Sequence, residues 1–490
     1  GDKFIPALEL IQEAVKLHED KKYEEAIKKY DLVHPNDSLY DLALYEKALS
    51  CVAGKNFRET IKTAKAGLAV SKLYRRSFLI LLGNAYDDIG KSDSAEIIYN
   101  IGDREFPYHY NFSYEKGVSM MKKKDFKRAM EYFRNSFSKN PFHANTHYKI
   151  GDIAANAGDV GLAMMAFQFY SMLNYFNNQV SFGIDLVEKT ANNDYKKELE
   201  VPAKFFPCLS GFEDVNQILL SKIATTAKFK NKIGLNYNYN RQLQMLFEQM
   251  PRDVKCDDDV LNFYLNFYRE LYEKGHFEGM IIYTFQNFTS PYIQSEVKRK
   301  KNKAVAFYQW FKKYMEDQRY TDVEVEKNGT KSKLKKWFSY TNDLESIGLK
   351  DGDGKETGEW TYFNKYGYVS AKGSFTDGKM SGPWSFYHFN GMLKSISQHK
   401  DGKLNGESVI FHANGAMEEK LSYQDNKIEG KALIFHPNQA PHFDLNIKNS
   451  KRNGVKVEYD KEGNKILEIT ETDGLGNGPY KRFYNNGQLS

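Results

Sequence analysis

The chain has 490 residues and a mass of 56.8 kDa, which is too long for one hydrophobic core and predicts two to four domains. Its 70 basic and 64 acidic residues leave a formal net charge of +6, which is too small to indicate a nucleic-acid partner. No run of about 18 apolar residues is present, so the sequence predicts no transmembrane helix. Cys51, Cys208 and Cys256 lack C-x-x-C spacing, which argues against a disulfide framework.

The N-terminal third repeats a pattern about every 34 residues. One small residue recurs at steps of 34, 35, 34 and 34, at Ala26, Thr60, Ala95, Ala129 and Ala163. A break-and-restart signal such as Lys124-Asp125-Phe126 precedes each of them, and the apolar spacing between these marks is helical. The pattern resembles the tetratricopeptide repeat, a helix–turn–helix unit of 34 residues. The resemblance predicts a helical array over residues 1–175.

In tetratricopeptide arrays the first helix of each unit lines a concave groove. Carried over position by position, the resemblance implies that the groove contains Tyr45, Asn84, Asp87, Asp88, Asn111, Tyr114, Asn145, Tyr148 and Asp152. The family's clamp for a C-terminal EEVD carboxylate needs Lys and Asn in the first unit, but Ile11 and Val15 stand there. The expected ligand is instead an extended peptide, and the alternative is that these side chains only solvate the groove.

Residues 176–330 are less regular and are predicted to be mainly helical. Helical spacing occurs at Val215–Ala227 and Arg241–Met250, separated by a looser segment at Leu235–Asn240. A further tetratricopeptide-like unit is predicted at 260–291, with Gly279 at its small position, followed by a closing amphipathic helix at 302–316. We expect the domain boundary near 320–350, where Asn328-Gly329 and a run of lysines interrupt the helical period.

Residues 331–490 contain a second array, with six units of 24 residues from residue 353. Each unit has an entry glycine, at Gly358, Gly382, Gly406, Gly430, Gly454 and Gly478. Exit glycines follow at Gly367, Gly391, Gly415, Gly463 and Gly487, and Gln439 replaces the remaining one. A ring column lies between them, at Phe363, Tyr387, Phe411, Phe435, Tyr459 and Phe483. Asp-Gly and Asn-Gly turns between short aromatic strands predict hairpins, and alternation places Trp360 and Tyr362 on one face with Phe363 on the other.

This unit resembles the MORN repeat, and in particular its bacterial YwqK-like form. The resemblance implies an elongated antiparallel sheet of stacked hairpins with a ladder of aromatic side chains. It also implies scaffolding and partner binding, and lipid binding has been proposed for some such arrays. The predicted fold class is therefore α + β and multidomain, with a tetratricopeptide-like α-solenoid followed by a MORN-type repeat sheet.

Two patterns superficially resemble metal sites. One repeat column holds three histidines, His388, His412 and His436. Neighbouring units are two strands wide, so these side chains should lie about 9–10 Å apart, too far to share one zinc ion. The segment Asp351-Gly-Asp353-Gly-Lys355 lacks the third acidic or amide ligand of a calcium loop, and a plain turn is expected. The sequence predicts no metal and no cofactor.

The run Lys298–Lys301, followed by Trp310 and Phe311, is either a basic patch with aromatic side chains or, as we favour, a solvated helix face. No nucleophile elbow, phosphate-binding loop or zinc motif occurs, so no enzyme activity and no small-molecule substrate are predicted. An enzyme acting on cell wall or lipid would need a buried site in 176–320, where Glu213, Asp214 and Glu270 are available.

The sequence therefore predicts a non-enzymatic scaffold or adaptor that binds other protein subunits and no nucleic acid. The combination of arrays resembles tetratricopeptide lipoproteins of bacterial outer-membrane assembly and secretion machines. That resemblance implies a cell-envelope protein, periplasmic or associated with the outer membrane, with peripheral or lipid-anchored membrane contact. The chain starts at Gly1 rather than Met, which is compatible with removal of an upstream segment. The alternative is a soluble cytoplasmic module that binds a peptide or a toxin.

Overall fold

The structure is a computed structural model in which two compact units are distinguished, and each is described by itself. The first unit comprises Gly1–Asp37, Glu46–Lys65 and Ser77–Asp317, and the second comprises Ser38–Tyr45, Ala66–Arg76 and Gln318–Ser490. The backbone is described for residues 6–174, 180–192, 194–195, 200–201, 213–235, 237–250, 258–318, 320–327, 330–340, 344–484 and 486–490. Cys208, Cys256 and the Asn328-Gly329 pair lie outside these residues, whereas Cys51 is buried and burial raises the pKa of its thiol to about 11.

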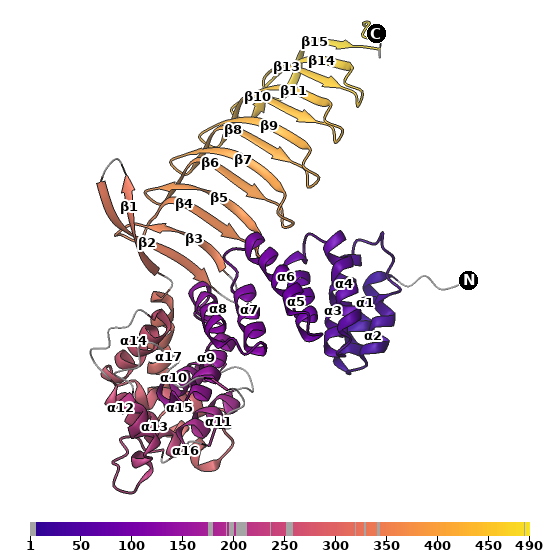
Figure 1. Cartoon of the computed structure of the whole chain (residues 1–490). Coiled ribbons are helices and arrows are strands. Elements are labelled where there is room, and N and C mark those ends of the chain that lie inside the picture. The colour runs from indigo at the N-terminus through magenta and orange to yellow at the C-terminus, as the bar shows by residue number, and fades with distance from the viewer. Residues whose placement is uncertain are drawn as a thin grey trace. The chain divides into compact units, whose positions relative to one another are not determined.

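The N-terminal part consists of antiparallel helix pairs, as the 34-residue period predicts (Figure 1). The pairs are α1 (Ala7–Glu19) with α2 (Tyr23–Tyr30), α3 (Tyr40–Ala53) with α4 (Phe57–Val70), α5 (Arg75–Asp88) with α6 (Ser92–Glu105), α7 (Tyr110–Lys122) with α8 (Phe126–Lys139), and α9 (Ala144–Ala157) with α10 (Val160–Leu173). The recurring small residues are all fully buried, at Ala26, Thr60, Ala95, Ala129 and Ala163. Small side chains at these positions allow the helices to approach closely.

Every predicted break-and-restart is a turn through the left-handed backbone region. The residue in that conformation recurs with the period of the array, at Lys21 (φ 62°), Lys55 (φ 57°), Gly90 (φ 78°), Lys124 (φ 60°) and Gly158 (φ 85°). A left-handed residue ends a helix and reverses the chain, and glycine adopts it without the steric penalty of a side chain. The three lysines show that the array fixes this turn even where the residue type disfavours it.

Glycine in the first helix of a unit makes room for a ring from the second. A Cβ at Gly83 would lie 2.3 Å from the Tyr99 ring, and one at Gly151 would lie 2.7 Å from Phe167. In the third such pair, a Cβ at Gly117 would lie 2.5 Å from Cε1 of Phe133. These distances are shorter than carbon–carbon contact, so any side chain at these positions must displace a ring that is fully buried.

We expect Gly117→Ala to lower the free energy of unfolding by about 1–3 kcal/mol, because the added methyl group overlaps the fully buried ring of Phe133. Chemical denaturation of Gly117→Ala, Phe133→Leu and the double variant measures this cost. The double variant should lose less than the sum of the single variants, because the smaller side chain accommodates the methyl group. Additive losses would show that this ring is not what excludes a side chain at Gly117.

The helices after residue 176 differ in detail from the predicted ones. They are α11 (Val180–Ala191), α12 (Glu213–Leu220), the 3-10 turn η2 (Ile223–Thr225), α13 (Asn238–Gln249), α14 (Asp259–Glu273), α15 (Phe277–Phe285), α16 (Pro291–Arg299) and α17 (Lys301–Asp317). The helix predicted at Val215–Ala227 ends at Leu220, because Lys222 takes the left-handed conformation (φ 56°). Asn238–Asn240 of the looser segment already belong to α13.

The unit predicted at 260–291 contains two helices joined by a turn in which Gly275 is left-handed (φ 73°). Its small residue contacts α17, because a Cβ at Gly279 would lie 2.4 Å from the carbonyl oxygen of Lys303 and 2.8 Å from Phe307. Thus α15 packs against the predicted closing helix. Together with α10 and α14 these helices form one extensive aromatic core, in which Phe169, Phe267 and Phe311 contact one another.

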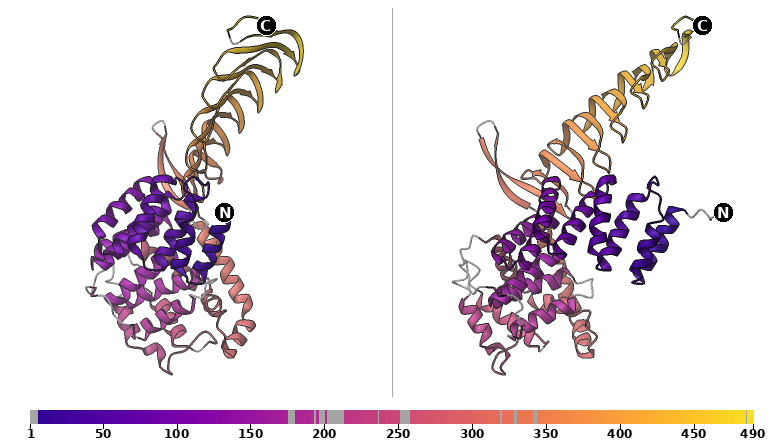
Figure 2. Two further views of the ribbon diagram at one scale, coloured as in Figure 1. Left: turned by 90° about the vertical axis from the view of Figure 1, so that its right-hand side faces the viewer. Right: turned by 45° about the vertical axis from the view of Figure 1, so that its right-hand side comes forward.

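The C-terminal part is one open antiparallel sheet in which each strand, apart from the short β12, pairs with the next along the chain. Its strands are β1 (Tyr320–Lys327), β2 (Thr330–Tyr340), β3 (Leu344–Lys350), β4 (Glu356–Phe363), β5 (Val369–Thr376), β6 (Lys379–Tyr387), β7 (Leu393–Lys400), β8 (Lys403–Phe411), β9 (Met417–Gln424), β10 (Lys427–Phe435), β11 (Pro441–Lys448), β12 (Lys451–Arg452), β13 (Gly454–Tyr459), β14 (Lys465–Thr472) and β15 (Leu475–Arg482). The short β12 pairs only with β11. Figure 2 shows the hairpins of the sheet stacked one after another. The sheet begins at Tyr320, so β1 falls inside the range 176–330 that the sequence assigns to helices.

The predicted glycines occupy two kinds of position: the entry glycines lie inside a strand or at its start, and the exit glycines lie in the turns that follow a strand. Five entry glycines have positive φ, at Gly358, Gly382, Gly406, Gly430 and Gly454. The exit positions have positive φ as well, at Gly367, Gly391, Gly415, Gly463 and Gly487, and the exceptional Gln439 adopts φ 72°. The sixth entry glycine, Gly478, differs: it is a close-approach position, where a Cβ would lie 2.5 Å from Cβ of Thr470.

The buried line of the sheet is not the recurring ring column. Register shifts recur just before the ring, for example between Tyr362 and Phe363, and the ring column is only half-buried. The buried side chains form another row, with Trp360, Trp384, Leu421, Ala432 and Leu445. The aromatic ladder that the structure shows runs through this row: the Trp360 ring lies 5.9 Å from Tyr362, as the alternation predicts, and Tyr362 lies 6.2 Å from Trp384.

Candidate protein-binding groove

The first helices of successive units place one set of polar side chains together. Asp87 of α5 accepts hydrogen bonds from Ser92 and Ser119, both at 2.7 Å, and its second oxygen lies 2.8 Å from Nζ of Lys122 on α7. Lys122 also binds Asp88 at 2.8 Å. Burial alone would raise the pKa of Asp87, but these hydrogen bonds outweigh it and hold that pKa below its usual value.

Asn84 connects this cluster to a carboxyl group that the sequence analysis did not select. Its Oδ1 accepts a hydrogen bond of 2.7 Å from the Tyr99 hydroxyl, and its side chain also bonds to Glu115 of α7. Burial raises the pKa of Glu115 to about 7, and the Asn84 hydrogen bond opposes this rise. Glu115 follows the selected Tyr114 directly on the same helix. This adjacency was the feature of the sequence that could have identified Glu115 as a candidate.

Aromatic side chains continue the surface along α7 and α9. Tyr114 meets the ring of His143 edge-on at 4.8 Å, and the Tyr148 ring lies 5.7 Å from Tyr170 and 5.8 Å from Phe182. Burial, followed by the proximity of Glu115, raises the pKa of the Tyr114 hydroxyl well above its usual value. His143 and Phe182 were also missed, because they lie outside the first-helix positions from which the candidates were chosen.

The remaining candidates are placed less centrally. Asp152 of α9 accepts hydrogen bonds from Asn156 and from the Tyr195 hydroxyl, both at 2.9 Å. Asn111 is half-buried in the first turn of α7, and Asn145 is exposed in the first turn of α9. Tyr45 belongs to the other compact unit, where it stacks on Tyr74 at 4.9 Å. The structure thus joins Asp87 and Asp88 through Lys122 and joins Asn84 to Glu115, which lies within electrostatic range of both aspartates. The role of all nine residues in binding stays a prediction.

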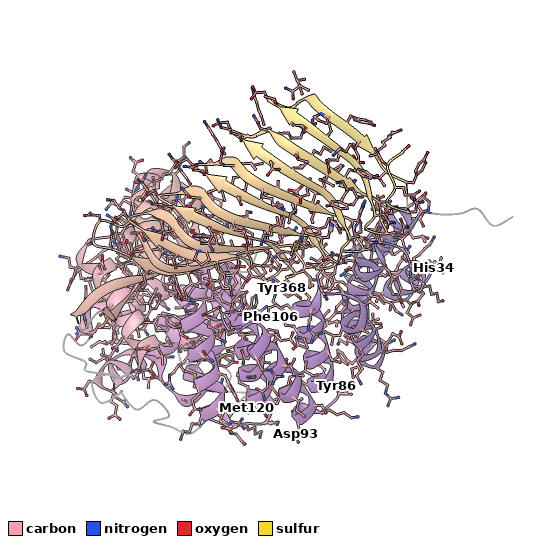
Figure 3. The ribbon with its side chains drawn as sticks, turned by 90° about the horizontal axis from the view of Figure 1, so that it is seen from above. His34, Tyr86, Asp93, Phe106, Met120 and Tyr368 are labelled. Carbon is pink, nitrogen blue, oxygen red and sulfur yellow. The ribbon has the colours of Figure 1, made fainter. Side chains whose placement is uncertain are left out.

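Figure 3 shows the side chains of the helical array, including Phe106 at the end of α6 and Met120 on α7. Both are buried. These apolar side chains hold the helix pairs together. Of the polar and aromatic side chains described above, Asp87 is buried, Tyr114, Glu115 and Tyr148 are half-buried, and Asp88 is exposed. The array therefore combines a rigid support with a surface of ordered side chains.

The histidine column connects repeats of the sheet. Nε2 of His388 lies 3.1 Å from the carbonyl oxygen of Phe411 in the next unit, and Nε2 of His436 lies 3.1 Å from that of Tyr459. His412 instead has Nδ1 3.5 Å from Glu418. The rings of His388 and His436 thus each connect one repeat to the next. Within the residues that the structure describes, no cluster of His, Cys, Asp or Glu has the arrangement of a metal site.

The segment Asp351–Lys355 forms a turn closed by its own side chain. Oδ1 of Asp351 accepts hydrogen bonds from the backbone N–H of Asp353 at 3.0 Å and of Lys355 at 2.9 Å. These bonds are those of an Asx-type turn between β3 and β4. The same oxygen is thereby occupied by local backbone groups, as expected for a plain turn.

Two residues of the basic run at Lys298–Lys301, Arg299 and Lys300, are paired with acidic side chains. Lys300 lies 2.6 Å from Glu278 and 3.2 Å from Glu296, and Arg299 lies 2.7 Å from Glu296. Phe311 is buried, and Trp310 stacks on His276 at 5.0 Å between ring centres. Such pairing is common on a solvated helix face, which is the interpretation that the sequence analysis favours.

The three carboxylates considered for catalysis differ in their exposure and in their contacts. Glu213 and Asp214 are exposed in the first turn of α12. Glu270 is half-buried on α14, where Lys274 lies 2.6 Å away and the Trp310 indole N–H is 3.4 Å away.

In the part of the chain that the structure describes, none of the helices has the length and apolar character needed to cross a membrane.

Comparison with known protein families agrees with the predicted C-terminal repeat type. The family model described as a MORN repeat variant matches residues 380–401 and 404–425. No curated protein matches the chain. Among solved structures, the chain is similar to YrrB, titled a TPR protein with an unusual peptide-binding site, at 15% identity and a TM-score of 0.26, covering 37% of this chain and 92% of that one.

Two further solved structures show the same distant likeness. A MamA structure is 16% identical with a TM-score of 0.26, covering 34% of this chain and 96% of that one. A tetratricopeptide repeat protein from Parabacteroides merdae is 12% identical with a TM-score of 0.30, covering 60% of this chain and 97% of that one. The helix pairs, their left-handed turns and the register of the sheet identify the repeats independently of these scores. The chain is thus a tetratricopeptide-like helical array followed by C-terminal MORN repeats.

Proposed function

We propose that this protein is a non-enzymatic scaffold that binds other protein subunits through the groove of its helical array. The observation that carries the proposal is the set of side chains on α5, α7 and α9, where hydrogen-bonded carboxylates adjoin partly covered rings. Rings that are already ordered by their neighbours lose little conformational entropy on binding, which favours their use as anchors for a partner.

We further propose that the assembly belongs to the bacterial cell envelope and serves outer-membrane protein assembly or secretion. The support is the resemblance of the paired arrays to tetratricopeptide lipoproteins of such machines, which is analogy at the level of architecture. The alternative is a soluble module in the cytoplasm that binds a peptide or toxin. The two proposals differ in where the protein is found and in which partners it retains.

Affinity purification from native membranes, followed by mass spectrometry, tests the proposal. We expect a membrane-machine subunit with the unaltered chain and a clear loss of it with Tyr148→Ala, which removes a groove ring. Tyr132→Ala on the second helix α8 is the matched control and should retain the partner. Recovery of the protein without any membrane subunit would contradict the envelope assignment, and a partner found only in the cytoplasmic fraction would favour the soluble module.

A further inference from the structure

We propose that the groove along α5, α7 and α9 binds an extended protein segment that carries cationic side chains. This inference rests on the proposed binding function of the groove and adds the charge class of the partner. Two features of the surface lead to it: the balance of charge at the junction of α5 and α7, and the rings that continue from it along α7 and α9.

The charge at the junction is negative because three carboxyl groups share one ammonium group. Lys122 binds Asp87 and Asp88 at the same distance, 2.8 Å, so its charge is divided between them. Glu115 is the third carboxyl group of the cluster, and its side-chain partner is the neutral amide of Asn84. With Glu115 ionised, these four groups carry a net charge of −2, since three negative charges meet one positive charge. A second cation would balance the cluster more fully.

Glu115 is the group that would gain most from a bound cation. It is half-buried, and burial raises its pKa to about 7, while Asp87 and Asp88 raise it further and Lys122 lowers it. The Tyr99 and Tyr114 hydroxyl groups also lie within electrostatic range. Near neutral pH this carboxyl group is therefore divided between its two protonation states, and a cationic ligand would stabilise the ionised one.

The rings provide the second half of a site for cations. Tyr114 lies within electrostatic range of Glu115, and Tyr148 and Phe182 continue the aromatic surface along α9 and α11, where Phe182 is 45% exposed. Lys149 already places its ammonium group 5.2 Å from the centre of the Tyr148 ring, so a cation can reach this surface. Lysine and arginine side chains bind best where a ring face and a carboxylate occur together.

The same features disfavour an acidic segment or a C-terminal carboxylate as the ligand. A negative group entering beside Asp87, Asp88 and Glu115 would meet like charges, which weakens binding. A neutral segment would contact the rings but leave the carboxylates without a partner. The surface therefore discriminates among extended segments by their charge.

Fluorescence anisotropy with the full chain tests the inference, using three labelled Gly-Ser-based peptides that carry lysine and arginine, glutamate, or no charge. We expect the basic peptide to bind best, and Glu115→Gln and Asp88→Asn each to weaken it about tenfold. Glu131→Gln on α8, where the carboxylate is exposed, is the matched control and should leave binding unchanged. Thermal unfolding confirms that each variant is folded, and Asp88, which is exposed, provides a variant with little structural risk.

The pH dependence gives an independent readout. Because a cationic ligand requires the ionised carboxyl group, affinity for the basic peptide should fall as the pH decreases from 8 to 6, and Glu115→Gln should abolish that dependence. Equal affinity for the three peptides, tighter binding of the acidic one, or no binding of any peptide would overturn the inference. Recovery of envelope subunits by affinity purification would then still support the proposed function. If instead the basic peptide binds as expected but no envelope subunit is recovered, the charge preference of the groove would be supported and the envelope assignment would be contradicted.

Discussion

Trp384→Ala should destabilise the repeat sheet by about 3–5 kcal/mol. The Trp384 side chain is 2% exposed, and its indole N–H donates to the carbonyl oxygen of Ser374 at 3.0 Å. Its ring meets Phe375 edge-on at 5.0 Å, and it covers Gly373, where a Cβ would lie only 2.3 Å away. Removal of the indole therefore leaves a cavity in a thin sheet and a carbonyl group without its partner.

Hydrogen exchange followed by mass spectrometry measures this loss strand by strand. In a repeat array each unit is stabilised mainly by its neighbours, so protection should decrease most in β5–β7 and less towards either end of the sheet. Tyr387→Ala on the same strand is the matched control, because it removes a half-buried ring of the recurring column. A loss of protection for Tyr387→Ala that equals or exceeds that for Trp384→Ala would contradict the buried row described above.

The contrast between Trp384 and Tyr387 shows which features of the sheet could be predicted from the sequence. A repeat shows which residue types recur, and glycines recur because the backbone needs positive φ at fixed places, as at Gly367 and Gly391. It does not show which recurring side chain is covered. The register shift just before each ring is a property of strand pairing, and it leaves the ring of Tyr387 half-buried while Trp384 is enclosed.

The helical array shows the same division between local and long-range information. Periodicity identified the helix pairs and their turns, because these depend on residues close together in the sequence. The packing of Gly279 against α17 depends on residues more than twenty positions away, and the predicted unit gave no sign of it. The start of the sheet at Tyr320 was hidden for a related reason: the alternation of Val323 and Val325 is short and lies among lysines and acidic residues.

The groove was only partly predictable from the resemblance. Position within the repeat selected Asn84, Asp87 and Asp88, which the structure brings together. The same reasoning could not assign a perturbed pKa to Glu115, because that property arises from burial and from charges on a neighbouring helix. Lys122 was overlooked because a lysine near the end of a helix is ordinarily a solvated side chain.

A buried histidine at the centre of the helical unit should make stability depend on pH. His147 is fully buried, and its Nε2 lies 2.8 Å from the carbonyl oxygen of Pro141, which can only accept a hydrogen bond. Nε2 therefore carries the proton, and Nδ1 accepts from the Tyr264 hydroxyl at 2.6 Å. Burial among aromatic rings lowers the pKa of His147 to about 3, from a usual value of 6.5.

The sign of the effect follows from which state binds the proton. Between pH 6.5 and about 3 the unfolded chain protonates this histidine and the folded chain does not, so protons favour unfolding. The contribution of His147 to stability is complete above pH 6.5 and decreases by about 1.4 kcal/mol for each unit below it, or about 2 kcal/mol between pH 6.5 and 5. Glu115 and Asp159, whose pKa values burial raises to about 7 and about 6, act in the opposite direction, since their folded forms retain protons.

A difference measurement separates these contributions. His147→Gln keeps an amide that can hydrogen-bond in the site but removes the titrating ring, while Glu115 and Asp159 remain in both proteins. We expect the free energy of unfolding of the unaltered chain, minus that of His147→Gln, to be constant above pH 7 and to fall by about 2 kcal/mol between pH 6.5 and 5. Urea denaturation at a series of pH values measures it. A difference that stays constant down to pH 5 would mean that the folded protein accommodates a charged His147, and that the core around it is more polar than its aromatic neighbours indicate.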